Sequence, residues 1–108
     1  MNKKYWENKK VLITGAHGFV GSNLMKLLQE KDCEVLSPTS KELDLTSEDR
    51  VKNYFFSHKP NIVLHLAGKV GGIAANKAAP GEFFYKNIIM GTLVMEYARQ
   101  IGCEKVVA

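Results

Sequence analysis

The chain has 108 residues, of which 45% are hydrophobic and 24% are charged, and its formal net charge is +4. This size suits one small domain with its own core. No apolar run reaches the roughly 18 residues of a membrane-spanning helix. No signal-type apolar segment follows the basic start MNKKYWENKK, so we expect a cytoplasmic protein without a membrane partner.

Four lysines lie in the first ten residues. They form neither a helical stripe nor a pattern interleaved with aromatic residues. We therefore expect a solvated basic lead-in over residues 1–9 and no nucleic-acid partner. The two cysteines, Cys33 and Cys103, form no CxxC pair, and we expect reduced structural thiols and no metal site.

The first predicted elements are a strand, a helix and a second strand. Residues 10–14 (KVLIT) are a continuous apolar run, typical of a parallel strand that is buried on both faces. Apolar residues three and four apart predict a helix over residues 19–30. A short strand is expected at residues 34–36, and the pattern at 43–45 is compatible with a short edge strand.

The second half repeats this alternation. A helix is expected to begin at Glu48, with Thr46 or Ser47 as its N-cap, and to end at Pro60. Residues 61–67 (NIVLHLA) form another apolar strand, residues 81–101 a long helix, and residues 105–108 the start of a last strand. Strands that alternate with helices indicate an α/β fold, a doubly wound parallel sheet in three α/β/α layers.

Residues 14–21, TGAHGFVG, lie where the first strand meets the first helix. Glycine lets another group approach the backbone closely, and the positive end of a helix dipole suits a pyrophosphate. We expect Gly15 to make the turn, Gly18 to admit the phosphates and Gly21 to let the helix pack on the strand. The spacing is GxxGxxG, whereas the usual dinucleotide fingerprint is GxGxxG. The expected contacts of this loop are Gly15, Ala16, His17, Gly18, Phe19, Val20 and Gly21.

TGxxGxxG near the start of the chain resembles the extended short-chain dehydrogenase/reductase family, which has a Rossmann-type fold. The resemblance implies an enzyme that acts on a nucleotide sugar with a nicotinamide dinucleotide. Asp44 and Leu45 match the family's Asp-hydrophobic pair, which the resemblance places beside the adenine. The resemblance also implies cofactor contacts at Leu66, Ala67 and Gly68, in HLAG beside the nicotinamide ribose, and at Asn87 in the long helix.

The segment KVGGIAANKAAPGEFFYKN, residues 69–87, is similar to one in the GDP-L-fucose synthase subfamily. That resemblance implies a substrate pocket bordered by Val70, Gly71, Gly72, Ile73 and Asn76. It favours a GDP-sugar as substrate. It also implies a homodimer through the long helix at 81–101, although the rest of a longer chain would cover that helix equally well.

The loop after the second strand, LSPTSK, carries no acidic residue that would bind a ribose 2′-hydroxyl. Ser40 and Lys41 could instead receive a 2′-phosphate, one as hydroxyl donor and one as charge, and His17 could face the same place. The alternative is that all three are solvated loop residues. We therefore favour NADP(H), with NAD(H) as the alternative. His65, inside an apolar strand, is expected to be a hydrogen-bonded core residue rather than a general base.

The family's catalytic groups are a serine or threonine after the fifth strand and a Tyr-x-x-x-Lys motif. The sequence ends at VVA, before them, and the spacing fits only Tyr5 with Lys9, in the lead-in. We expect no catalytic residue in this chain. Residues 10–108 would form a dinucleotide-binding domain that is incomplete, truncated at about the fifth strand, and the C-terminal substrate domain would be absent.

The resulting hypothesis is the N-terminal, NADP(H)-binding part of an epimerase/reductase that converts GDP-4-keto-6-deoxymannose to GDP-fucose with NADPH. An alternative within the family is an NAD-dependent nucleotide-sugar 4-epimerase or 4,6-dehydratase. An alternative from another class is a non-catalytic dinucleotide-binding module.

Overall fold

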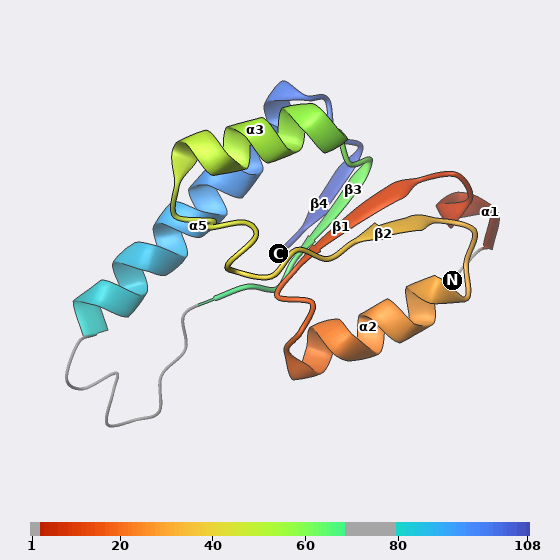
Figure 1. The fold of residues 1–108 in the computed structure, drawn as a ribbon, viewed down its shortest axis with the longest axis horizontal. Helices are drawn as coiled ribbons and strands as arrows, with labels where there is room; N and C mark the ends of the chain where they lie inside the picture. Colours follow the sequence, from red (N-terminus) through yellow and green to blue (C-terminus); the bar gives the residue numbers. More distant parts are fainter. Residues whose placement is uncertain (1–2, 69–79) are drawn as a thin grey trace.

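The computed structural model describes residues 3–68 and 80–108 (Figure 1). The predicted alternation of strands and helices is confirmed. In chain order the elements are α1 (Lys3–Trp6), β1 (Lys10–Thr14), α2 (Phe19–Gln29), β2 (Glu34–Leu36), α3 (Glu48–His58), β3 (Ile62–His65), α5 (Pro80–Gln100) and β4 (Lys105–Val107).

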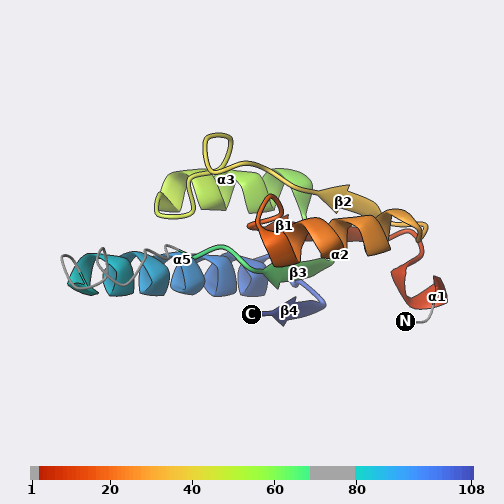
Figure 2. The ribbon, with the colours of Figure 1, turned by 90° about the horizontal axis from the view of Figure 1, so that it is seen from below.

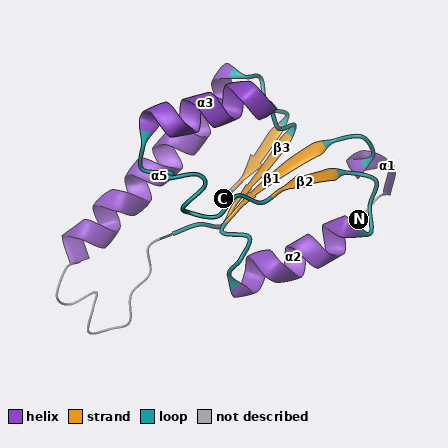
Figure 3. Cartoon of the chain, in the orientation of Figure 1, coloured by secondary structure: helices purple, strands orange, loops and turns teal. Residues whose placement is uncertain are grey.

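The four strands form one parallel sheet in the order β2-β1-β3-β4 (labelled in Figure 1; strands are orange in Figure 3). From β1 the chain first moves outward to β2, and then returns to the other side of β1 for β3 and β4. The order therefore reverses between β1 and β3, where Val11 is in register with Ile62 and Thr14 with His65. This is the doubly wound parallel arrangement predicted from the sequence.

Alternation along β1 supplies both faces of the sheet. Val11 and Ile13 pack with Leu28 of α2 on one face. Leu12 points to the other face, where it joins Phe55 of α3. Helix α2 therefore covers one face, while α3 and α5 cover the opposite face (Figure 1). The sheet lies between two helical layers, as predicted.

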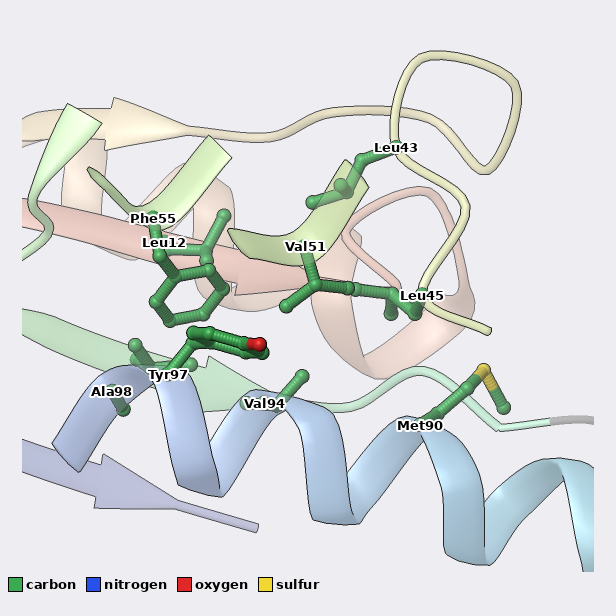
Figure 4. Packing of buried hydrophobic residues seen from close by; sticks show 10 residues of the cluster. Leu12, Leu43, Leu45, Val51, Phe55, Met90, Val94, Tyr97 and Ala98 are labelled. Carbon is green, nitrogen blue, oxygen red and sulfur yellow. The ribbon is translucent and has the colours of Figure 1, made fainter. Parts of the chain in front are cut away.

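The core on the α3 and α5 side is the larger of the two. Figure 4 shows its side chains gathered between β1, α3 and α5. Leu43 and Leu45, in the segment before α3, are buried in it. Residues 43–45 form no strand in the described structure, so the edge-strand reading is wrong. The side chain of Asp44 instead accepts bonds from the Thr46 N–H (3.0 Å) and hydroxyl (2.6 Å), and such a local turn competes with extended pairing.

The predicted ends of α3 are close to those observed. Ser47 is the N-cap, because its side chain accepts a 3.4 Å bond from the Arg50 N–H, and Glu48 and Asp49 lie in the first turn. The helix ends at His58, and Lys59 takes a left-handed conformation with φ of 46° before Pro60. The third strand ends at His65, two residues earlier than predicted.

The first residues are partly integrated into the fold. Trp6, in α1, is buried in the cluster on the α2 side of the sheet. The Asn8 N–H donates a 2.7 Å bond to the Asp32 carbonyl oxygen. This packing could not be predicted from the sequence, because a single tryptophan among lysines shows no periodicity.

Within the described residues, no helix has the length and apolar character needed to cross a membrane. The longest helix, α5, projects past the sheet at its amino-terminal end (Figure 2).

Candidate functional site

A cavity of about 450 Å³ lies at the carboxyl ends of β1 and β3. This is the point where the strand order reverses, the usual place for a ligand in an open parallel sheet. The segment between β2 and α3 closes one side. The lining residues are Thr14, Gly15, His17, Gly18, Pro38, Thr39, Ser40, Leu43, Asp44, Leu45, Thr46, Leu66, Ala67, Gly68 and Met90.

Gly15 and Gly21 are required by contacts within the chain. Gly15 has φ of +73°, and a Cβ there would lie 2.7 Å from the Ala67 amide nitrogen. A Cβ on Gly21 would collide with the carbonyl oxygen of Gly15. The turn after β1 is therefore packed tightly between the chain leaving β3 and the first turn of α2.

Gly18 lines the cavity without such a constraint. Its backbone is extended, with φ of −79° and ψ of 179°, which any residue can adopt. A Cβ there would meet only the Gly15 carbonyl oxygen, at an ordinary 3.4 Å. Because the chain itself leaves room for a side chain, the bare backbone at this position is available for close approach by a ligand.

The amino-terminal ends of α2 and α3 differ in the partners that their first backbone N–H groups have. Ser47 caps α3, and two acidic residues sit in its first turn. Helix α2 has Gly18 at its N-cap, no side-chain cap and no acidic residue in its first turn. The first N–H groups of a helix lack intrahelical partners and carry its positive dipole end. The end of α2 beside the cavity therefore suits an anionic group such as a pyrophosphate.

The loop after β2 is shaped by Thr39 and Glu42. The Glu42 carboxylate accepts a 2.9 Å bond from the Thr39 N–H, and the Thr39 hydroxyl accepts a 3.2 Å bond from the Glu42 N–H. The backbone bond, followed by the Thr39 hydroxyl and nearby His17, lowers the pKa of Glu42. The Glu42 carboxylate is thus tied to its own loop, with Ser40 in the cavity and Lys41 exposed outside its lining.

Thr14 and His65 join the ends of β1 and β3. The Thr14 hydroxyl lies 2.7 Å from Nδ1 of His65 and accepts bonds from the N–H groups of Leu66 (3.1 Å) and Ala67 (3.2 Å). Burial lowers the pKa of His65. The expectation of a hydrogen-bonded histidine within the sheet is confirmed.

The structure brings together nine of the predicted cofactor residues and leaves six outside the cavity. The nine that line it are Gly15, His17, Gly18, Ser40, Asp44, Leu45, Leu66, Ala67 and Gly68.

The other six lie in different surroundings. Ala16 and Gly21 are buried in packing contacts, and Phe19, Val20 and Lys41 are exposed. Asn87 lies near the cavity, since its Oδ1 would be 3.6 Å from a Cβ on Gly68. The predicted substrate residues Val70, Gly71, Gly72, Ile73 and Asn76 fall outside the described residues.

Sequence reasoning missed several lining residues. Thr14 carried a usable signal, a hydroxyl at the end of an apolar strand directly before the glycine turn. Met90 lies four residues before Val94, on the buried side of α5, so helical spacing could have identified it. Pro38, Thr39, Leu43 and Thr46 line the cavity through a loop whose path the sequence did not reveal.

Comparison with protein families gives a match over residues 11–108 to the NAD dependent epimerase/dehydratase family. The match runs from the second residue of β1 through β4 and includes every residue that lines the cavity.

Two curated relatives are similar along most of the chain. A GDP-L-colitose synthase of Yersinia pseudotuberculosis is 42% identical over 96 residues, 89% of this chain and 31% of the relative. A GDP-L-fucose synthase of Sinorhizobium fredii is 38% identical over 99 residues, 92% of this chain and 32% of the relative. The chain thus spans about a third of the length of these relatives.

Among solved structures, MlghC, a GDP-mannoheptose C4 reductase from Campylobacter jejuni with NADP bound, has a similar fold. Its TM-score is 0.86 at 29% identity, and the alignment covers 98% of this chain and 32% of the reductase. The alignment therefore covers nearly all of this chain and about a third of a structure that has NADP bound.

Proposed function

The chain belongs to the NAD dependent epimerase/dehydratase family, and from this premise we propose that its cavity binds a nicotinamide dinucleotide, NADP(H) in preference to NAD(H). The observation that carries the proposal is the uncapped end of α2, where Gly18 leaves its backbone open beside a 450 Å³ cavity. Residues of this chain therefore fit the group. When bound, the nicotinamide supplies or accepts a hydride.

The lining residues divide the site into three parts. Gly15 and Gly18, with the first N–H groups of α2, hold the pyrophosphate. Asp44 and Leu45 border the adenine, and Leu66 to Gly68 border the nicotinamide ribose, with Asn87 nearby. All but Asn87 line the cavity, which supports these assignments.

The preference for NADP(H) rests on the loop after β2. Ser40 lines the cavity and Lys41 follows it directly. Glu42 is held by Thr39, so its carboxylate is not presented to a ribose as in NAD-specific sites. The MlghC reductase with NADP bound also supports this choice.

We propose that the whole protein is a reductase/epimerase that acts on a GDP-sugar, and specifically an enzyme of the GDP-L-fucose synthase type. Both curated relatives are named for GDP-sugar products, fucose and colitose. Residues 10–108 are then the first part of the dinucleotide-binding domain. The substrate domain and the catalytic Ser and Tyr-x-x-x-Lys groups, which the family resemblance implies, would then lie outside these residues.

The cofactor preference can be tested with the substitution Lys41→Ala in the full-length protein. We expect NADPH affinity to fall about tenfold, as for the loss of one charge-assisted contact, while NADH affinity stays within about twofold. Lys52→Ala, an exposed lysine of α3, is the matched control. Equal losses for both dinucleotides would contradict the assignment of Lys41 to the 2′-phosphate.

The substrate proposal needs its own assay. NADPH oxidation should depend on added GDP-4-keto-6-deoxymannose. Turnover of a nucleotide sugar with tightly held NAD and no net NADPH oxidation would indicate a 4-epimerase or a 4,6-dehydratase. Dinucleotide binding with neither activity would indicate the non-catalytic module.

We also propose that α5 pairs with the same helix of a second copy. Phe84, Tyr85, Ile88 and Met95 are exposed on it. A shallow groove along the helix includes Gly91, where a Cβ would meet nothing within 4 Å, so another helix can approach closely. An alternative occupant is a later part of the same protein.

A further inference from the structure

Thr14 occupies an unusual position for a polar residue. It is 2% exposed, and among the described residues it is the one buried residue of the polar or charged types, aromatic residues aside. Its hydroxyl oxygen has three neighbours: Nδ1 of His65 at 2.7 Å and the N–H groups of Leu66 and Ala67 at 3.1 and 3.2 Å. All three belong to the last residue of β3 or the two residues that follow it.

A hydroxyl has one proton and two lone pairs. The two N–H groups occupy the lone pairs, so the hydroxyl proton has to point to the remaining neighbour, Nδ1 of His65. Nδ1 must then accept, which leaves the ring proton on Nε2. A proton on Nδ1 would place three donors against one oxygen.

We propose that His65 is a positioning residue for the dinucleotide site: as the neutral Nε2–H tautomer it accepts the Thr14 hydroxyl proton, and so holds the chain leaving β3 against the glycine turn. The proposal rests on the proposed function, because residues 66–68 line the cavity assigned to the cofactor.

The two N–H groups depend on the hydroxyl to different degrees. The Leu66 N–H also bonds the Thr14 carbonyl oxygen at 3.0 Å, so it keeps a partner if the hydroxyl turns. The Ala67 N–H bonds the hydroxyl. The Ala67 nitrogen is also the atom that a Cβ on Gly15 would meet at 2.7 Å. Loss of the His65 acceptor therefore lets the Thr14 hydroxyl turn, and this weakens its bond to the Ala67 N–H. Ala67 packs against Gly15, in the turn that precedes Gly18.

Protonation of His65 breaks this arrangement, because Nδ1 then carries a proton and the hydroxyl loses its acceptor. Burial lowers the pKa of His65, in agreement with a site built for the neutral ring. The elements packed against β3 are β1, β4 and α5, and its side chains also meet those of α2 and α3 in the two cores. Together these elements carry the following charged groups and histidine in the described chain: Lys10, Lys105, Lys26, Glu48, Asp49, Arg50, Lys52, His58, the pair Glu82 and Lys86, and the pair Glu96 and Arg99.

None of these charges contributes to the pKa of His65, for which burial is the sole cause. Lys10 and Lys105 lie near the opposite end of the sheet, in register with Glu34 and Ile62. Of the tyrosines on α5, Tyr97 donates to Glu48 and Tyr85 is exposed. Protonation of His65 itself is therefore the event that the proposal invokes.

Two substitutions separate the acceptor from the titration. His65→Asn puts an amide oxygen near the position of Nδ1, so it accepts the hydroxyl proton but does not titrate. His65→Leu keeps an apolar body and removes the acceptor. In the protein expressed from its native reading frame, NADPH affinity at neutral pH should stay within about twofold in His65→Asn and fall about three- to tenfold in His65→Leu, the effect of one hydrogen bond.

The decisive readout is the pH profile of NADPH affinity, from about pH 7.5 to about pH 5. The 2′-phosphate titrates in this range in every variant, so its effect cancels when the NADPH affinity of the wild type is divided by that of His65→Asn. This affinity ratio should be about threefold or more lower at the acidic end than at neutral pH. A constant ratio would overturn the proposal, and it can be obtained even where His65→Leu does not fold.

Heteronuclear NMR of the imidazole nitrogens tests the tautomer without cofactor. A protonated Nε2 and a bare Nδ1 are expected at neutral pH, and the reverse pattern would overturn the proposal. Failure of the wild type to bind NADPH at any pH would instead refute the proposed function. The NMR experiment would still test the hydrogen-bond arrangement, because it needs no cofactor.

Discussion

At the scale of single residues, Gly15 and Gly21 are fixed by contacts within the chain, whereas Gly18 is not. The first two would each place a Cβ against backbone atoms, and Gly15 also has a positive φ. Gly18 has an extended backbone and space beside the cavity. The same residue type therefore serves folding at two positions and ligand access at the third.

This difference predicts opposite outcomes for alanine substitutions. Gly21→Ala should lower the free energy of unfolding by about 3 kcal/mol or more, because the new methyl group overlaps the Gly15 carbonyl. Gly18→Ala should cost less than about 1 kcal/mol, as at other uncapped helix ends. Urea titrations of the two variants provide the comparison, and equal destabilisation would contradict the assignment.

His65 should make stability depend on pH in one direction. Its pKa is lowered by burial from the 6.5 of an unperturbed histidine, so the folded state binds the proton less readily than the unfolded chain. The stabilisation is then complete above about pH 6.5 and is lost as the pH falls below it.

Urea midpoints at neutral and mildly acidic pH check this prediction. The wild type should lose more stability than His65→Asn on acidification. The carboxylates titrate in both proteins, whereas the His65 imidazole is present only in the wild type. If the two proteins lose stability in parallel, His65 does not favour its neutral form in the fold.

Among single residues, sequence reasoning succeeded where the reason was local. The strand end, the glycines and the helix start are adjacent in the chain, so Gly15 and Gly18 could be predicted to share a site. The bond between Thr14 and His65 joins residues 51 positions apart, and it requires the β1–β3 register. The sequence placed His65 inside the sheet but could not reveal its partner.

At the scale of elements, α3 shows how local chemistry sets the ends of a helix. Ser47 and the acidic first turn begin it, as the sequence indicated, and Lys59 ends it in a left-handed conformation. A left-handed conformation costs a lysine about 1 kcal/mol or more, and glycine pays no such cost. The following Pro60 prevents the helix from continuing.

Lys59→Gly should therefore stabilise the protein by about 0.5–1 kcal/mol, even though it removes an exposed charged side chain. Lys59→Ala is the matched control, since it removes the same charge without relieving the strain, and should give no gain. Thermal or urea unfolding distinguishes them. Equal stability of the two variants would show that the conformation is not the cause.

The element that sequence reasoning misread lies between β2 and α3. Alternating leucines at 43 and 45 fit a strand, but Asp44 bonds to Thr46 and both leucines enter the same core. Alternation of apolar and polar residues indicates which side chains are buried, not which backbone conformation they adopt. A turn produces the same pattern when the side chains on either side of it point into the core. This loop supplies much of the cavity wall, so the misreading also hid four lining residues.

At the scale of the whole molecule, the described residues build a sheet whose switch point faces the cavity, and a long helix that projects from it (Figure 2). The doubly wound order could be predicted because parallel strands with intervening helices permit few topologies. The partner of α5 could not, since exposed apolar residues fit a second copy or a later part of the chain.

The proposed dimer predicts that Met95→Glu shifts the full-length protein to a monomer, because a carboxylate would be buried in the helix pair. Leu27→Glu, on the exposed side of α2, changes a similarly exposed residue outside the proposed interface and should leave the dimer intact. Light scattering after size-exclusion chromatography gives the mass. A wild-type monomer, or an unchanged mass for Met95→Glu, would favour cover of α5 by the same chain.

The central claim is that the cavity at the carboxyl ends of β1 and β3 binds NADP(H) at the uncapped end of α2. Fluorescence titration of NADPH into the full-length protein and its Gly18→Ala variant tests it most directly. We predict saturable binding by the wild type and at least about tenfold weaker binding by the folded variant. Equal affinities, or no binding by the wild type, would contradict the claim.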